Sequence, residues 1–357
     1  DNPIVDNTAG GTPVTGICEL GAKNYLFNMQ LSADQQSLLA NYLGEEVVES
    51  VAKAYLEGPI AALGTLNLGA DLESRVIRNT FDPYANKGMF TDGQNIGIMF
   101  GAEYTHLRLD SGSHVDSDNY NVVVGPAFRF DGPVGQLGLG IFFEAGYGDY
   151  SSYNSFPGFS ADGDGDTRYY GGGIALRNNF NYGIYADLSL RAGYAETDQS
   201  IDDRTGAGYD MDGAYYGGHI GLGKIFDFEQ NGRLDLGARL LWTHLNGDDV
   251  TTDAGEDLSI DDSDSLRSQL GARYTYDFTA MLSGYAGAAW EYEFDGEVSG
   301  DLDDHGIDEP SLKGSTGIGE LGISVNPTEN LSVDLGVQGY VGQREGIGGT
   351  LQVNFEF

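Results

Sequence analysis

From about residue 95 to its end, the chain alternates between apolar and polar or glycine positions. In the segment 95–107, for example, Ile96 and Phe100 share one face of an extended chain, while Gly101 and Glu103 share the other. A period of two residues is typical of a β-strand. The alternation therefore predicts a strand here.

The same alternation recurs along the rest of the chain and predicts about twelve strands in all. The other eleven segments are 119–130, 136–148, 168–180, 182–195, 214–226, 233–245, 265–278, 280–294, 311–325, 331–344 and 346–357. A strand of a soluble protein has about 5 to 6 residues, whereas a tilted strand needs about 9 to 11 to cross a bilayer. These segments are long enough to cross, so their length favours an all-β transmembrane barrel of antiparallel strands over a soluble sandwich.

The two faces of the strands differ in charge, and the connections differ in length. One face of the segment 136–148 carries Leu137, Ile141 and Phe143, and the opposite face carries Glu144. Aromatic residues gather near the strand ends on the apolar face, as in the girdles of membrane barrels. Short connections (131–135, 179–182, 228–232, 326–330) take turns with long ones (150–166, 197–212, 246–264, 295–310). Together these features indicate an outer-membrane barrel with short periplasmic turns.

If the apolar face meets lipid, the charged face encloses a pore. The residues expected to line it are Glu103, Arg129, Glu144, Arg177, Asp187, Arg191, Arg239, Arg267, Arg273, Glu291, Glu320 and Asp334. Both signs of charge occur, so these side chains could pair with one another, with a helix in the pore or with a passing chain. A solvated lumen network with no role for a passenger is the alternative.

The N-terminal quarter has a different pattern. Residues 1–31 show no period and are expected to form an extended linker or a passenger remnant. Residues 32–80 are predicted to be helical, with Ser32 and Gln35 as a capping box, an interruption at Gly58-Pro59 and a second helical stretch at 59–78. Because this stretch is rich in Ala and Gly, it could lie close to surrounding walls, so we predict a pore helix followed by a barrel at 81–357. An amphipathic helix pair on a globular domain is the alternative.

Composition and charge exclude other classes. The chain has 55 Gly, 22 Tyr and 17 Phe, which suits aromatic strands and many turns. Its formal net charge of -37 would repel phosphates, so no nucleic acid partner is expected. The single cysteine, Cys18, cannot form an intramolecular disulfide.

Candidate sites for a cofactor or for catalysis are weak. Asp162, Asp164 and Asp166 are spaced like the start of a calcium loop, but Thr167 stands where that loop needs glycine. We therefore expect no cofactor, with a divalent cation at the acidic loops as the alternative. The histidines lack a metal-binding spacing, and His305 among loop aspartates is the only candidate for a hydrolase at the rim. Catalysis is not expected.

Taken in order, several segments resemble the C-terminal translocator of the autotransporters of type V secretion, over about residues 35–357. The segments are GSHVD (112–116), FFEAGYGDYSSYNSF (142–156), GDGDTRYYGGGI (163–174), AAWEYEFDGEVSG (288–300), EPSLKGSTGIGELGISV (309–325) and DLGVQGYVGQREGIGGTLQVNFEF (334–357). The resemblance implies an integral outer-membrane barrel of twelve strands with a helix through the pore, which exports or displays an N-terminal passenger.

The resemblance also implies partners. These are outer-membrane lipid and lipopolysaccharide, the chain's own passenger, and the barrel assembly machinery, which would recognise Leu351, Val353, Phe355 and Phe357 as a C-terminal signal. The barrel is expected to be monomeric. One departure is that residues 32–79 lack the Asn-Asn pair at which some members cleave themselves, so such cleavage is not expected. A stand-alone outer-membrane porin or surface adhesin is the alternative function.

Overall fold

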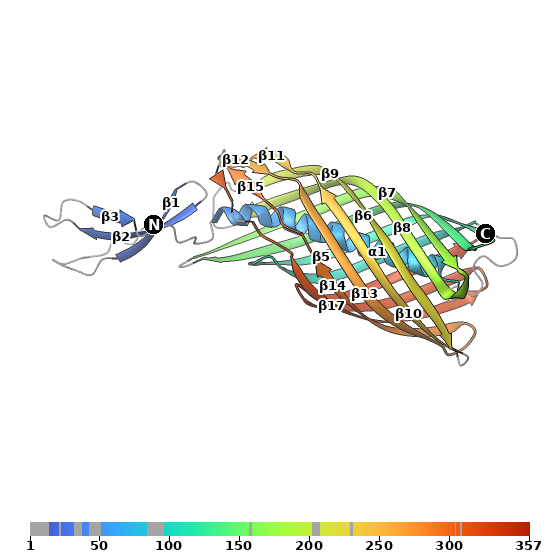
Figure 1. Cartoon of the computed structure of the whole chain (residues 1–357). Coiled ribbons are helices and arrows are strands. Elements are labelled where there is room, and N and C mark those ends of the chain that lie inside the picture. The colour runs from blue at the N-terminus through green and yellow to red at the C-terminus, as the bar shows by residue number, and fades with distance from the viewer. Residues whose placement is uncertain are drawn as a thin grey trace.

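Twelve antiparallel strands close into one barrel (Figure 1). The computed structural model describes residues 14–20, 23–31, 38–42, 51–83, 96–156, 159–201, 208–228, 231–303, 305–307 and 309–357. The barrel strands are β4 (Ile96–Asp110), β5 (His114–Gly132), β6 (Gly135–Phe156), β7 (Phe159–Phe180), β8 (Ile184–Ile201), β9 (Tyr209–Phe228), β10 (Gly232–Leu245), β13 (Ser263–Asp277), β14 (Leu282–Glu293), β17 (Gly314–Thr328), β18 (Leu331–Gly342) and β19 (Arg344–Glu356). Each pairs with its neighbours along the chain, and β19 pairs with β4 to close the wall. The predicted barrel is confirmed.

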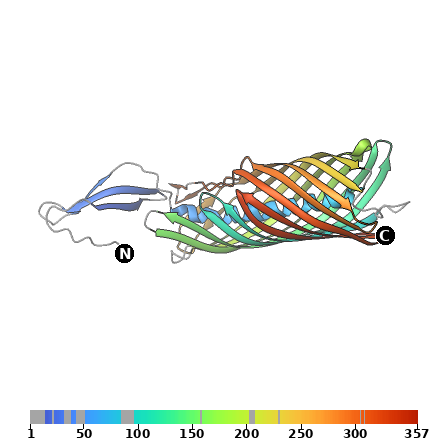
Figure 2. The same ribbon diagram turned by 90° about the horizontal axis from the view of Figure 1, so that it is seen from below.

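A helix occupies the barrel. The 3-10 helix η1 (Val51–Leu56) leads into α1 (Glu57–Phe81), which runs along the inside of the barrel wall (Figures 1 and 2). All residues of α1 except Arg78 are buried. The prediction of a helical segment in the pore is confirmed. Among the described residues, no helix combines the length and hydrophobicity of a membrane span.

The helix begins later than the sequence predicted. Residues 38–42 form strand β3 (Leu38–Tyr42), which pairs with β2 (Lys23–Leu31), and β2 pairs with β1 (Val14–Leu20). This sheet lies beyond the N-terminal end of α1 (Figure 1). Backbone pairing with β2 has overridden the local helical period, because propensity is a weak guide where tertiary partners exist. The capping-box residues, Ser32 and Gln35, lie outside the described residues.

Gly58-Pro59 does not interrupt the helix. Both residues lie in the first turn of α1. The first four N–H groups of a helix have no partner within it, so the N–H that proline lacks is not missed at this position. The predicted break is therefore the start of the helix.

The two rims of the barrel differ. At one rim the links are short: Asn231 (φ 64) lies between β9 and β10, and the 3-10 turn η2 (Asn181–Gly183), with Tyr182 at φ 66, joins β7 to β8. At the other rim, residues predicted as loops are strand. The segment 150–166 belongs mostly to the long hairpin β6–β7, because its backbone continues the cross-strand pairing.

Two further predicted loops fold into a small sheet at this long rim. The loops 246–264 and 295–310 contain β11 (Asp248–Thr251), β12 (Asp257–Ile260), β15 (Gly300–Leu302) and β16 (His305–Gly306), which pair in that order. We refer to these four strands as the lid. The alternating pattern of the sequence did not predict these four short strands.

The outer face of the wall is apolar. Exposed side chains include Ile141 at 46%, Phe143 at 52%, Leu190 at 56% and Leu321 at 64%. An aqueous monomer rarely exposes so large a continuous apolar surface, whereas a lipid-facing barrel requires it. Aromatic pairs such as Tyr104–Tyr120 border this surface. The strands therefore present their apolar faces to the membrane.

Candidate functional site: the occupied lumen

The start of α1 is fixed at the long rim. Glu57 is fully buried and accepts hydrogen bonds from the hydroxyls of Ser111 (2.9 Å) and Ser113, at the tip of the β4–β5 hairpin. The Tyr209 hydroxyl donates to the carbonyl of Tyr55. Since α1 begins here and ends near the short rim, any chain N-terminal to α1 leaves the barrel at the long rim.

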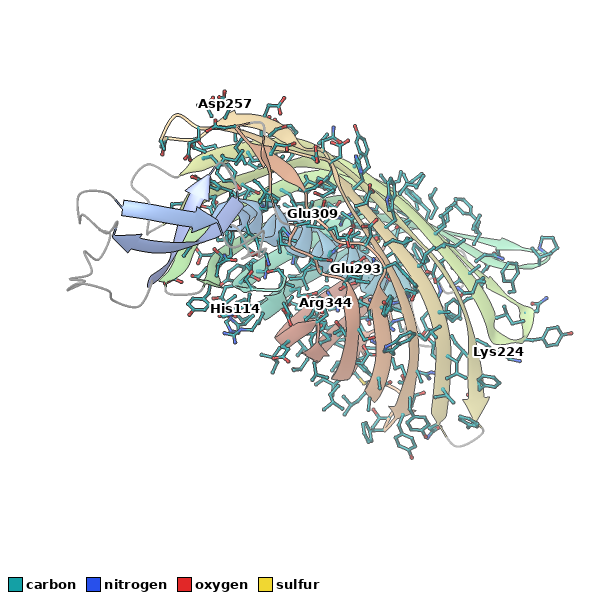
Figure 3. All side chains as sticks on the ribbon, turned by 60° about the vertical axis from the view of Figure 1, so that its left-hand side comes forward. His114, Lys224, Asp257, Glu293, Glu309 and Arg344 are labelled. Atoms are coloured by element: carbon teal, nitrogen blue, oxygen red, sulfur yellow. The ribbon has the colours of Figure 1, made fainter. Side chains whose placement is uncertain are left out.

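The lid covers this end of the helix. One apolar cluster joins lid residues to η1 and to the start of α1; its lid and loop members are Leu258, Ile260, Val298, Leu302, Ile307 and Leu312. The Tyr55 hydroxyl donates to Glu256 at 2.5 Å. Figure 3 shows Asp257 of the lid at the end of the barrel nearest the β1–β3 sheet. The lid thus packs over the N-terminal end of the helix at the long rim.

Along β4 to β9, the fit between α1 and the wall is close. A Cβ on Gly64 would lie 2.5 Å from the Leu109 side chain, and a Cβ on Gly69 would overlap the hydroxyl of Tyr169. A Cβ on Gly58 would lie 2.6 Å from the Gln199 side chain. A larger residue at any of these positions would force a wall side chain to move, and at Gly69 it would also meet the ring of Tyr169. The small residues of the sequence do allow close contact, as predicted.

A buried ion-pair layer joins α1 to β13, β14 and β19 at Asp71. The Asp71 carboxylate accepts hydrogen bonds from Arg267 and Arg344, each at 3.0 Å. The same two guanidiniums pair with Glu291, at 3.2 and 2.6 Å. Figure 3 shows Arg344 within the barrel beside α1. Two arginines thus share two carboxylates, and the helix supplies one of them.

Arg191 ties the helix backbone to the opposite wall. It donates to the carbonyl of Leu66 at 2.8 Å and to Glu144 at 2.9 Å, and the Tyr215 hydroxyl donates to Glu144 at 2.8 Å. Arg191 and Glu144 are both fully buried side chains. Such a charge needs several partners to offset its desolvation, and the helix carbonyl is one of them.

A Ser-His-Asp set lies nearby but is fully engaged with the helix. His219 contacts Ser189 (2.7 Å) through one ring nitrogen and Asp187 (2.9 Å) through the other. Helix residue Glu73 lies 3.3 Å from the same ring and accepts from Ser189 at 3.1 Å. Ser189 is 1% exposed and His219 is 4% exposed. The set is thus buried against the helix and can anchor α1.

The C-terminal part of α1 is bound to several strands. Arg75 pairs with Glu103, and Arg78 lies 3.4 Å from Glu320, which Arg273 also holds at 2.6 Å. The last polar contacts are amide and hydroxyl bonds. They are Asn79 to Gln352 (2.9 Å), Thr80 to Asn354 (2.8 Å) and Asn179 to the carbonyl of Phe81 (2.7 Å).

The remaining residues predicted to line the pore lie on the inner side of the wall or at its end. Arg177 is fully buried, 3.6 Å from Asp187, and Asp334 accepts from the Tyr285 hydroxyl at 2.9 Å. Arg239 faces the space beside α1. Arg129 lies near the short rim, 3.5 Å from Asp131.

The helix residues Asp71, Glu73 and Arg75 were missed by the sequence analysis. The signal available in the sequence was the presence of these charged residues, two positions apart, within a helix rich in Ala and Gly. Each of the three meets a wall residue of opposite charge or a histidine.

Asp162, Asp164 and Asp166 do not form a loop. They lie on one side of β7, where alternation points them outward, and Asp164 accepts from Ser151 at 2.9 Å. Among the described residues, no group of three or more His, Cys, Asp or Glu side chains could hold a metal ion. A divalent cation at these residues stays a prediction. The side chain of His305 lies outside what the structure describes.

Aspartates meet across neighbouring strands beyond the aromatic border. The strand register places five directly opposite one another in sequence: Asp118, Asp149, Asp166, Asp198 and Asp210. Like charges in directly opposed positions repel. A hydrogen bond with Asp210, together with burial and this repulsion, raises the pKa of Asp198. The row is electrostatically unfavourable at neutral pH.

The C-terminal residues lie in β19 and directly after it. Leu351, Phe355 and Phe357 are exposed on the outer face, with Val353 between them on the same side. The rings of Phe355 and Phe357 are 5.3 Å apart, edge to face. These residues are thus accessible from the membrane side, as an assembly signal would need to be.

Known proteins agree with this architecture. The family model described as the autotransporter β-domain matches residues 99–338. Comparison with curated proteins finds no match.

Three solved structures share the fold at low identity. The transport unit of the autotransporter AIDA-I from Escherichia coli is 17% identical, with a TM-score of 0.58, covering 81% of this chain and 98% of that one. The β-domain of the Bordetella autotransporter BrkA is 17% identical with a TM-score of 0.57, covering 74% and 100%. The translocator domain of NalP from Neisseria meningitidis is 14% identical with a TM-score of 0.54, covering 84% and 99%. With its closed barrel, its apolar outer wall and its internal helix, the chain belongs to the autotransporter β-domain family and is an outer-membrane translocator for the export of a passenger.

Proposed function

We propose that α1 remains in the barrel after export as a plug, and that residues N-terminal to it stay outside the cell or link to the passenger. The observation that carries this is the burial of the whole of α1 apart from Arg78, inside a closed wall. A helix fixed by glycine contacts, by the Asp71 layer and by the lid would not leave spontaneously. A translocator in this state conducts ions poorly.

Planar-bilayer conductance tests the plug. We expect the full chain to give a small conductance, and a chain lacking residues 1–80 to give a large, stable one, because the wall would then enclose open water. A large conductance of the full chain, unchanged by the deletion, would instead support the stand-alone porin. Circular dichroism of both chains checks that the barrel has folded.

We also propose the partners. Lipid and lipopolysaccharide would surround a single barrel, since the apolar band runs over the outer face. The barrel assembly machinery would recognise the exposed C-terminal residues. If so, Phe357→Ala should reduce the amount of barrel in the outer membrane of cells while purified protein still refolds in detergent. Equal loss in both assays would mean that Phe357 serves stability only.

No catalytic role is proposed for the lumen. The Ser-His-Asp set described above is buried and contacts Glu73, so its hydroxyl is engaged by the helix while α1 is in place. Ser189→Ala should leave the passenger attached to the same extent as in the unmodified protein. A change in passenger release on cell blots would contradict this.

A further inference from the structure

The helix does not fill the barrel evenly. Between α1 and strands β10, β13, β14, β17 and β18 lies a cavity of ≈ 80 Å³. Small residues on the wall make this space, among them Gly237, Gly271 and Ala289. A cavity needs a volume of about 10–15 Å³ to hold a single water. This cavity therefore has room for several waters or for one small ion with part of its hydration shell.

Some hydrogen-bond donors on the residues that line this cavity have no partner. Within the described part of the chain, Arg75 Nε, Arg78 Nε and the Tyr340 hydroxyl have no hydrogen-bond partner. Tyr340 is only 6% exposed. One acceptor, Gln338 Oε1, is also unpartnered among them. Unsatisfied buried donors are costly, so three such donors on residues that line one cavity favour a bound group that accepts hydrogen bonds, either water or an anion.

The charges around the cavity favour an anion. Its lining contains four arginines (Arg75, Arg78, Arg239, Arg273) and three acids (Asp71, Asp235, Glu320), an excess of one positive charge. This local excess stands out in a chain whose net charge is -37.

The three acids already have partners. Asp71 is held by Arg267 and Arg344, Glu320 by Arg273, and Asp235 accepts from the Tyr185 hydroxyl at 2.8 Å. Arg239 has no hydrogen bond or ion pair with another described residue. Of the four arginines, Arg75 pairs with Glu103, and Arg78 and Arg273 share Glu320, so Arg239 is the cation left available.

The cavity extends toward the short rim. A second cavity of ≈ 30 Å³ shares Arg78, Asp235 and Arg273 with the first and includes Asp82, just after the end of α1. In the opposite direction, the Asp71 layer separates the first cavity from the lid. An ion would therefore enter from the periplasmic side.

We propose that this cavity binds a small inorganic oxyanion of the phosphate class, held by Arg78, Arg239 and the Tyr340 hydroxyl. Guanidinium groups match the geometry and charge of such oxyanions. The site lies inside the wall and is too small for an acyl chain, so the ligand is a free ion rather than a lipid headgroup. The inference does not depend on the plug being permanent, because it concerns only the state with α1 inside.

Calorimetric titration of the full chain with inorganic phosphate tests the site, in a detergent without phosphate. Arg239→Gln should weaken phosphate binding at least about tenfold, the loss expected for one charge-assisted hydrogen bond. Arg239→Lys should restore part of the affinity. Arg108→Gln removes the same charge from the outer surface, where Arg108 pairs with Asp116, and should bind like the unmodified protein.

A change in shape gives an independent test. Ala289→Leu narrows the cavity without altering charge and should also reduce the affinity for phosphate. The retention of the compact form on unheated gels shows that each variant is folded. The proposal is overturned if the unmodified chain shows no saturable phosphate binding, which would mean that only water occupies the cavity. Equal weakening by Arg239→Gln and Arg108→Gln would likewise overturn it, since that is a general effect of charge.

Discussion

The two sides of the barrel hold the same helix in different ways. Along β4 to β9, glycines of α1 contact wall side chains so closely that a Cβ would displace them. Along β10 to β18 a cavity remains, and on this side Arg267 of β13 and Arg344 of β19 reach Asp71 of the helix. Close packing tolerates little change in side-chain volume. Long charged side chains tolerate a change in volume but not the loss of an ion-pair partner. Both sides therefore bind the helix by charge, since Arg191, Glu103 and His219 lie on β8, β4 and β9, but only the close side also sets its position by packing.

The largest expected effect comes from breaking the charged side. Asp71→Asn leaves Arg267 and Arg344 with one carboxylate, Glu291, in place of two. Removal of one partner of a buried ion pair costs about 3–5 kcal/mol. Urea unfolding of the full chain in micelles should show this loss of stability. In planar bilayers the pore of the variant should open frequently. An unchanged midpoint would mean that solvent already screens these charges.

Overpacking the close side should have the next largest effect. Gly69→Leu places a side chain against the Tyr169 hydroxyl and should destabilise the docked helix by about 1–3 kcal/mol. Protease digestion measures the result, because a displaced α1 becomes accessible to cleavage at Arg75 and Arg78. If Gly69→Leu resisted digestion like the unmodified chain, the wall would be able to move away from the helix.

The matched change on the loose side should cost less. Ala289→Leu enters the cavity and should alter the free energy of unfolding by less than about 1 kcal/mol, since it fills empty space. The same urea and protease assays apply. A cost equal to that of Gly69→Leu would remove the distinction between the two sides.

The smallest effect concerns charges outside the membrane. The pKa of Asp198 is raised by Asp210, so ionised Asp198 destabilises the fold above that pKa, and stability returns as the pH falls through it. Asp198→Asn should therefore stabilise the fold by roughly 0.2–0.5 kcal/mol at neutral pH and have no effect near pH 3.

Asp116 provides the control with the opposite sign. Its hydrogen bond from Arg108 lowers the pKa of Asp116, so its contribution is present at neutral pH and is lost on acidification. Asp116→Asn should destabilise slightly at neutral pH. Stabilisation by both variants would show that total charge, rather than the local partner, determines the effect. Thermal unfolding at several pH values measures both.

The barrel could be predicted from sequence because alternation and aromatic borders are local features. The extension of β7 through Asp162 to Asp166 could not, because glycine and aspartate have low strand propensity and only pairing with β6 keeps them extended. Likewise, the local helical period of residues 38–42 gave no sign of their partner strand, β2.

The lumen was predictable in part for the same reason. Strand parity is enough to assign Glu144 and Arg191 to the inner face. Which charges meet depends on the rotation of α1 and on the register of all twelve strands. Arg344 and Asp71, for instance, are separated by 273 residues. No local pattern contains that information.

The seam between β19 and β4 constrains the order of assembly. The ladder from Arg344 to Glu356 and the bond from the Phe357 N–H to the Ile96 carbonyl can form only after the last barrel strand has been synthesised. Until then the unfinished wall is an open, curved sheet. The lid packs over the N-terminal end of α1, so placing α1 before the seam closes would avoid this obstruction. In this order of events the barrel wall closes around the helix. Slow pairing of β19 with β4 would then favour correct threading of α1.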